Sequence, residues 1–105
     1  KYEGDFLESI SSIYDFKNQL DSSLYYAYKA KDSYIKNNKE KDLCLIYCDI
    51  GLLYKKTHNY EEALKYCNKS LNLANAQNNL HVKAGVLTNM ADKGIICHSP
   101  ITNLL

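Results

Sequence analysis

The chain has 105 residues, of which 46 % are hydrophobic, and 13 Lys and Arg against 12 Asp and Glu leave a formal net charge of +1. A near-neutral chain without a basic stripe lacks the electrostatic footprint of a general nucleic-acid binder, so no nucleic-acid partner is expected. No apolar run approaches the roughly 18 residues of a membrane-spanning helix, so no membrane partner is expected either.

Five helices are predicted in chain order, at about 4–17, 20–36, 41–57, 60–77 and 80–97. In the third, Leu43, Ile46 and Ile50 recur at three- and four-residue steps, which indicates one apolar face. Asn59 stands where the fourth helix begins, and we expect it to form an N-cap and a near capping box with Glu62. These features predict an all-α chain.

The ends of the predicted helices carry further signals. Asn38 and Asn78 stand where two helices end, and asparagine tolerates the left-handed conformation of a helix C-terminus. Ser99 and Pro100 are typical of the N-cap and first position of a sixth helix. The sequence given stops about one helical turn after them. We therefore expect the natural protein to be longer, because each unit of a helical array covers the apolar face of its neighbour.

An internal repeat of forty residues organises these helices into pairs. Shifting the sequence by forty aligns bulky residues with bulky ones and small residues with small ones: Ile10 with Ile50, Tyr14 with Tyr54, Leu24 with Leu64, Ser11 with Gly51 and Ser23 with Ala63. The units run over about 4–38, 41–78 and 80–105, the last of them truncated. We interpret 1–105 as a single domain of stacked helix pairs.

Large residues surround small ones at fixed positions of the second unit: Tyr47, Ile50, Gly51, Tyr54, Tyr60, Ala63, Leu64, Cys67, Ser70 and Leu71. In this pattern the unit resembles a tetratricopeptide repeat (TPR). In such a repeat Gly51 and Ala63 would let the helices of one pair approach, and Ser70 would admit the first helix of the next unit. The resemblance implies a right-handed α-solenoid of antiparallel helix pairs, a TPR-like superhelix of about 2.5 repeats.

The length of the repeat is similar to that of bacterial regulator and sensor arrays. Forty residues exceed the usual 34 of this family, which implies an extra turn in the second helix and a longer loop. The resemblance implies a protein- or peptide-binding scaffold module, the interaction or sensory part of a larger protein. An alternative is the peptide-signal receptor domain of a bacterial transcriptional regulator or sensor. Self-association through exposed repeat ends is a third possibility.

The resemblance also implies where a partner would lie, because the first helix of each pair lines a concave groove in this family. The groove residues carried over are Asp5, Glu8, Ser12, Asp15, Leu45, Cys48, Asp49, Leu52, Lys55, Lys56, Thr88, Asn89 and Asp92, with Phe16 and Gly85 beside them. We expect an acidic N-terminal end, an apolar middle and a basic lower edge. A carboxylate clamp is not expected, because only Asn89 matches the Lys and Asn that it needs. The other corresponding positions hold Leu45, Cys48, Asp49 and Leu52. The alternative is that these residues face solvent or a neighbouring chain.

Tyrosine and cysteine are expected to serve packing. Five of the ten tyrosines are predicted core residues, each with its hydroxyl at a wet edge: Tyr14, Tyr47, Tyr54, Tyr60 and Tyr66. Tyr25 and Tyr28 are either half-buried or part of a contact surface on the convex side. The four cysteines form no CxxC pair and are interpreted as small buried hydrophobes in a reducing compartment, hence a cytoplasmic location.

Catalytic chemistry is not predicted. His58 and His98 occupy equivalent turn positions, so the repeat explains them, and Cys97 beside His98 lacks an orienting group. No Cys and His spacing matches a zinc module, and the four glycines are isolated, so no phosphate loop exists. We therefore expect no enzyme activity, no metal and no cofactor.

Overall fold

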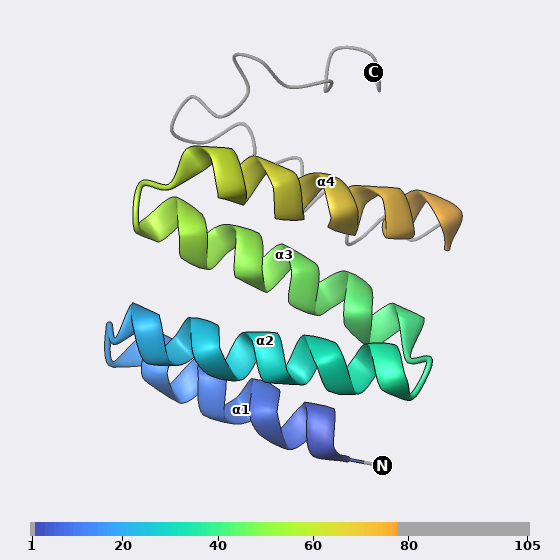
Figure 1. Ribbon diagram of the computed structural model, residues 1–105, viewed down its shortest axis with the longest axis horizontal. Coiled ribbons are helices and arrows are strands. Elements are labelled where there is room, and N and C mark those ends of the chain that lie inside the picture. The colour runs from blue at the N-terminus through green and yellow to red at the C-terminus, as the bar shows by residue number, and fades with distance from the viewer. Residues whose placement is uncertain (1, 78–105) are drawn as a thin grey trace.

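The computed structural model describes residues 2–77, which form four helices and no strand. These helices are α1 (Glu3–Phe16), α2 (Leu20–Lys36), α3 (Glu40–Lys56) and α4 (Tyr60–Ala76). They run back and forth, and each packs on its neighbour in sequence (Figure 1). The prediction of an all-α chain is confirmed for this part, and each predicted helix bound lies within one residue of the observed one. The helix expected at 80–97 and the one starting at Ser99 lie outside the described residues.

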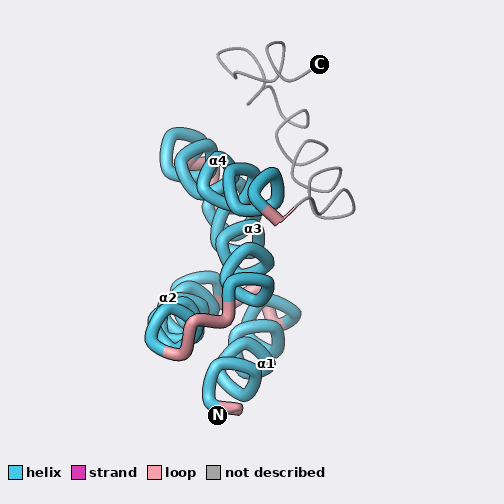
Figure 2. Tube along the Cα trace, turned by 90° about the vertical axis from the view of Figure 1, so that its right-hand side faces the viewer, coloured by secondary structure: helices cyan, strands magenta, loops and turns pink. Residues whose placement is uncertain are grey.

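The helices are arranged as two pairs that resemble a repeat. Seen nearly end-on, α1 and α3 lie toward one side of the molecule, and α2 and α4 toward the other (Figure 2). The tightest packing is within the pairs, α1 with α2 and α3 with α4, and α2 joins the pairs by packing on α3. The part of the chain that is described therefore has a helical repeat-like architecture.

Three identical turns, each of three residues, set the helix spacing. Asn18, Asn38 and His58 take the left-handed conformation at φ 60°, 55° and 63°. In the last turn the amide of His58 donates to the Lys55 carbonyl and the amide of Asn59 to the Tyr54 carbonyl. The other two turns repeat this pattern, which is a Schellman motif that satisfies carbonyls at a helix end. The left-handed conformation predicted at Asn38 is confirmed.

The expected capping box at Asn59 is wrong. Asn59 makes no side-chain cap hydrogen bond to α4. The turn explains this result, because Asn59 is at once the last residue of the Schellman motif and the N-cap of α4. Its amide closes α3, and its carbonyl accepts the first hydrogen bond of α4, from Ala63. Backbone groups therefore define both helix ends without a side chain.

The long repeat also differs from expectation. The sequence favoured an extra turn in the second helix and a longer loop. Instead, α2, α3 and α4 each have 17 residues, and each connection has three. A helix of 17 residues and a turn of three residues together span twenty residues. The forty-residue repeat therefore consists of two such helix-and-turn units of equal length. The extra length lies in both helices, and the loops stay short.

Small residues let the two helices of a pair approach closely. Between α1 and α2, the hydroxyls of Ser11 and Ser23 each donate to the other's carbonyl at 2.8 Å. Between α3 and α4, the hydroxyl of Ser70 donates to the Cys44 carbonyl at 2.8 Å, and the Cys44 thiol to the Ser70 carbonyl at 3.2 Å. Side-chain hydrogen bonds thus join the backbones within each pair, and all four residues are buried.

Ser70 bonds within its own pair, and the first helix of the next unit, which Ser70 is predicted to admit, lies outside the described residues. The role predicted for Gly51 and Ala63 is confirmed, since a Cβ on Gly51 would lie 3.2 Å from the Ala63 carbonyl oxygen. The residue equivalent to Ser70 one unit earlier, Ala30, packs with Ile46 in the core between α2 and α3.

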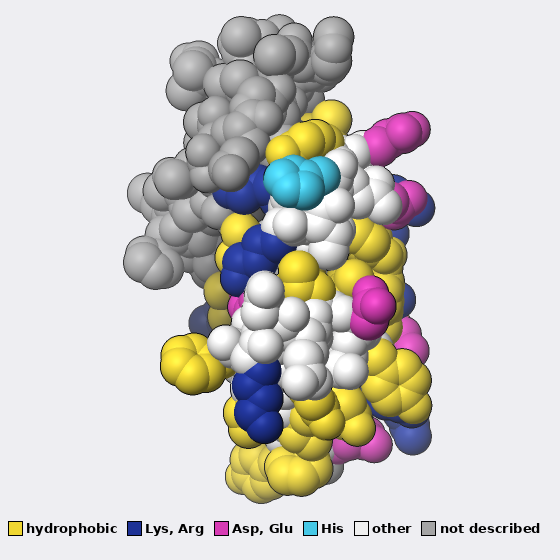
Figure 3. Space-filling view, turned by 90° about the vertical axis from the view of Figure 1, so that its left-hand side faces the viewer, with side chains coloured by type: hydrophobic (Ala, Val, Ile, Leu, Met, Phe, Trp, Pro, Cys, Tyr) yellow, Lys and Arg dark blue, Asp and Glu magenta, His cyan; other side chains and the backbone are white. Residues whose placement is uncertain are grey.

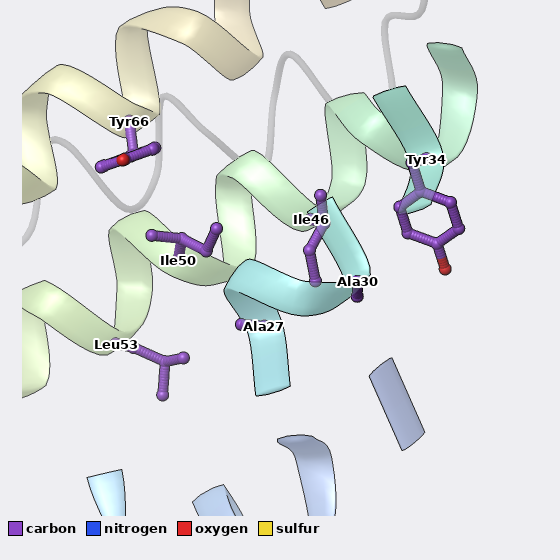
Figure 4. Packing of buried hydrophobic residues seen from close by; sticks show 7 residues of the cluster. All are labelled: Ala27, Ala30, Tyr34, Ile46, Ile50, Leu53 and Tyr66. Atoms are coloured by element: carbon purple, nitrogen blue, oxygen red, sulfur yellow. The ribbon is translucent and has the colours of Figure 1, made fainter. Parts of the chain in front are cut away.

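The core continues across the join between the two pairs (Figure 4). Its buried members come from α2, α3 and α4: Ala27, Ala30, Tyr34, Ile46, Ile50, Leu53 and Tyr66. A second cluster between α3 and α4 contains Cys44, Ala63, Cys67, Leu71 and Ala74. Burial of apolar area is the main stabilising term in both clusters.

The tyrosines divide by depth. Tyr66 is buried, and the other four tyrosines predicted in the core are half-buried. Tyr28 is half-buried with its hydroxyl against that of Tyr54, whereas Tyr25 is exposed. Cys44 and Cys67 are buried free thiols, as the sequence predicted, whereas Cys48 is a free thiol that is only half-buried, and Cys97 lies outside the described residues.

Candidate functional site

The face shared by α1 and α3, called here the α1–α3 face, carries a small pocket of about 80 Å³. Its lining comes from three helices: Glu8, Ser11, Ser12, Asp15, Ser23, Asp49, Leu52 and Leu53. The hydrogen-bonded serines Ser11 and Ser23 are buried, while carboxylates and Leu52 lie around them. The pocket exists because α2 packs behind both α1 and α3 and leaves a hollow between them.

Five of the residues predicted for the groove line this pocket: Glu8, Ser12, Asp15, Asp49 and Leu52. Leu45 and Cys48 lie on α3 outside the pocket lining, the first 43 % exposed and the second half-buried. Lys55 is half-buried and Lys56 exposed near the C-terminus of α3. Thr88, Asn89, Asp92 and Gly85 lie outside the described residues.

An ion pair joins the two helices of this face. Lys56 Nζ lies 2.8 Å from Asp15 Oδ1, which links the last turn of α3 to the last turns of α1. The pair is partly open to solvent, with side chains 41 % and 30 % exposed, so its contribution to stability is below about 1 kcal/mol. Its main effect is to hold one lysine beside the carboxylates of the pocket.

Asp49 is the most perturbed carboxyl of the face. Crowding by protein atoms is the first cause that raises its pKa, to about 7, and the charges of Glu8 and Asp15 raise it further. Lys56 acts in the opposite direction. Asp49 is nevertheless exposed to solvent, so the energy behind this shift is much smaller than for a sealed carboxyl.

Replacing Asp49 with asparagine is expected to change how stability depends on pH. The folded-state pKa lies above the ordinary value of 3.8, so the stabilisation is complete below about pH 4 and is lost as the pH rises through about 7. Asparagine does not ionise, so Asp49→Asn should be about 1 kcal/mol more stable than the parent above pH 7, relative to their difference at pH 4.

Urea unfolding at several pH values measures this difference. Asp32→Asn is the matched control for the chemical change, because the Asp32 side chain is 73 % exposed. A profile of Asp49→Asn that runs parallel to that of the parent would show that Asp49 titrates alike in the folded and unfolded chains.

Tyr34 is a residue of this region that the sequence did not single out. Its ring is 1 % exposed and packs where Gly4 has no side chain, and a Cβ there would lie 2.4 Å from the ring. Its hydroxyl reaches Glu8 Oε1 at 2.6 Å and Asp5 Oδ1 at 3.0 Å. Burial, followed by the hydrogen bonds to Glu8 and Asp5, raises the pKa of Tyr34. The neutral phenol has one hydrogen to donate, with Glu8 at the shorter distance and Asp5 also within reach, so it links two of the predicted groove carboxylates.

Tyr34 could have been found from the sequence by its spacing. Ala27, Ala30 and Tyr34 follow each other at three- and four-residue steps on one face of the second predicted helix. The alignment of the two units does not single out Tyr34, because the equivalent residue of the second unit is Ala74, a small residue.

Residues 2–77 contain no group of three His, Cys, Asp or Glu side chains that could hold a metal ion. None of the four described helices has the length and apolar character of a membrane span. His58, in its turn, lies 3.0 Å from the Tyr60 hydroxyl through Nδ1.

Comparison of the chain with protein-family models, with curated proteins and with solved structures finds no match.

Proposed function

We propose that this chain is a protein- or peptide-binding scaffold module of the TPR type, and that its ligand lies on the α1–α3 face. The observation that supports the proposal is the pocket on this face, which gathers five of the residues that the family resemblance assigned to the groove. The paired helices and the short identical turns support a right-handed solenoid of about 2.5 repeats as the wider architecture.

The chemistry of the face favours a peptide with both basic and apolar side chains. Glu8, Asp15 and Asp49 surround the pocket, and one lysine, Lys56, neutralises part of their charge. Leu45 and Leu52 offer apolar area on the same helix as Asp49. A basic side chain of the ligand would enter the pocket, where carboxylates attract it, while an apolar side chain would pack beside Leu52.

The module is proposed to act by binding alone, without catalysis or a cofactor. The described histidine, His58, is held by its left-handed turn conformation, a structural reason for its position. The buried thiols of Cys44 and Cys67 support a reducing compartment, and we propose the cytoplasm.

A peptide-array screen tests the proposal. The double variant Leu45→Glu/Leu52→Glu should lose at least about tenfold in affinity for any peptide that the parent binds, because it adds two charges to the apolar part of the face. Tyr25→Glu is the matched control, since Tyr25 is 55 % exposed and lies on α2. Peptides that bind parent and double variant equally would show that the ligand lies elsewhere.

A further inference from the structure

The outward face of α1 is an apolar surface distinct from the α1–α3 face. Phe6 is 67 % exposed, Ile13 54 % and Phe16 94 %, and half-buried Ile10 lies between them. The spacing of these residues places them along one side of the helix. Hydrophobic side chains gather at the end of the molecule where α1 lies, at the bottom of Figure 3. We call Phe6, Ile10, Ile13 and Phe16 the α1 outer face.

The repeat shows what this face is suited to contact. One unit further on, the residues equivalent to Phe6, Ile10 and Ile13 are Ile46, Ile50 and Leu53. Those three residues of α3 are 1 %, 0 % and 3 % exposed, because they are buried in the core that α3 forms with α2 (Figure 4). The same apolar positions are thus buried by a neighbouring helix in α3 and open to solvent in α1.

The helix that covers the equivalent residues of α3 is α2, and its composition indicates what kind of helix would fit α1. α2 contributes Ala27 and Ala30 to the shared core, both 0 % exposed, and small residues allow close approach of a helix that carries bulky ones. α2 also carries three lysines and two aspartates. By contrast, α1 carries four carboxylates and no basic residue between Glu3 and Phe16. A helix like α2 therefore matches the α1 outer face in shape, and its lysines match the net negative charge of α1 as a whole.

We propose that the α1 outer face is a docking surface for an amphipathic helix of a partner protein, one with small residues along its contact line and lysines on its flanks. A second copy of α1 fits this face less well. Phe6 and Ile13 would oppose bulky residues of the same kind, which holds the helices apart, and two strongly acidic helices would repel each other. The docking surface is independent of the ligand proposed for the α1–α3 face.

The test uses a peptide with the sequence of residues 19–37, blocked at both ends and carrying a fluorescein label. Titration of the full chain into this peptide is followed by fluorescence anisotropy, and we expect saturable binding. The variant Phe6→Asp/Ile13→Asp should weaken binding at least about tenfold. It should keep the circular dichroism of the parent, because both side chains are more than half exposed. If parent and variant bind the peptide equally, the peptide must be replacing the chain's own α2 in the fold instead of binding the α1 outer face. That result would overturn the proposal.

Two controls address the fit of the partner helix. A peptide with Ala27→Leu and Ala30→Leu should bind at least about tenfold more weakly, because leucine prevents close approach, whereas a peptide with Tyr25→Asp should bind like the parent peptide. Leu45→Glu/Leu52→Glu should leave peptide binding unchanged, so failure of this proposal and failure of the α1–α3 ligand are distinguishable. A bulky peptide that binds as well as the parent peptide would refute the assigned chemistry.

Other occupants give other results. A chain in which residues 1–42, carrying Phe6→Asp/Ile13→Asp in the added copy, are joined ahead of Glu3 keeps the forty-residue register. The added copy offers the original α1 a covering helix of the α2 sequence and presents no second apolar outer face. This extended chain should lose peptide binding, and retained binding would overturn the proposal. Sedimentation of the parent at increasing concentration detects a second copy. Self-association that Phe6→Asp/Ile13→Asp abolishes, in a chain that does not bind the peptide, would assign the face to a dimer and overturn the proposal.

Discussion

Replacing Ile50 with alanine is expected to lower the free energy of unfolding by about 3–4 kcal/mol. Ile50 is 0 % exposed and lies in the core that joins the two helix pairs, among residues of α2, α3 and α4. The truncation removes apolar area from the core and leaves a cavity that these packed helices fill only in part. Urea unfolding followed by the helical circular dichroism signal measures the loss, with the slope checked for a two-state transition.

The matched control is the same chemical change at Ile13. This side chain is 54 % exposed on α1, at the position equivalent to Leu53, which is 3 % exposed. Ile13→Ala should cost about 1 kcal/mol or less, because little buried area is lost. Equal losses at Ile13 and Ile50 would contradict the exposure of the α1 outer face and indicate that another helix covers it in solution.

The helices could be predicted from the sequence because the forty-residue repeat indicates both the apolar faces of the helices and the positions where helices end. It aligns Ile10 with Ile50, which fixes the apolar faces, and Asn38 with Asn78, which fixes the helix ends. The chain also contains a finer period of twenty residues. The left-handed residues Asn18, Asn38 and His58 stand twenty residues apart, which marks the ends of α1, α2 and α3 and excludes a long loop after each of them.

Features that depend on how two repeats differ could not be predicted in this way. In the first pair Gly4 receives the ring of Tyr34, while in the second pair Cys44 and Ala74 occupy the equivalent positions in the cluster of α3 and α4. The first pair thus combines a glycine with a large aromatic side chain, where the second pair has two small side chains. An alignment of the repeats compares each position separately, so it does not detect a compensation between two positions.

The candidate site was predictable in part. The resemblance placed Glu8, Asp15 and Asp49 on one face, and the structure brings them to one pocket. The contact of Lys56 with Asp15 and the raised pKa of Asp49 depend on how close α1 and α3 lie, which spacing within a helix does not specify. The absence of a side-chain cap hydrogen bond at Asn59 also depends on the three-dimensional structure. The turn before α4 already satisfies the backbone groups of Asn59.

Gly51→Leu is expected to destabilise the chain by about 3 kcal/mol, even though it removes a glycine from the middle of a helix. Glycine costs about 1 kcal/mol relative to alanine inside a helix, so propensity alone favours the change. A Cβ at residue 51, however, would lie 2.8 Å from the Cys67 sulfur and 3.2 Å from the Ala63 carbonyl oxygen. The second contact is to the backbone of α4, so α3 and α4 must separate to accommodate leucine, and this loss exceeds the gain in propensity.

A double-mutant cycle separates the two contacts. Gly51→Ala should also destabilise the chain, but less than leucine, and thermal unfolding measures the difference. In the background of Cys67→Ala the cost of Gly51→Ala should be smaller, because the nearest sulfur is gone, but it should not vanish, because the Ala63 oxygen remains. Asn72→Leu, at an exposed position of α4, is the control for adding an apolar side chain and should change stability by about 0.5 kcal/mol or less. A stabilising Gly51→Ala would contradict the close approach of the second helix pair, on which the packing of α3 against α4 depends.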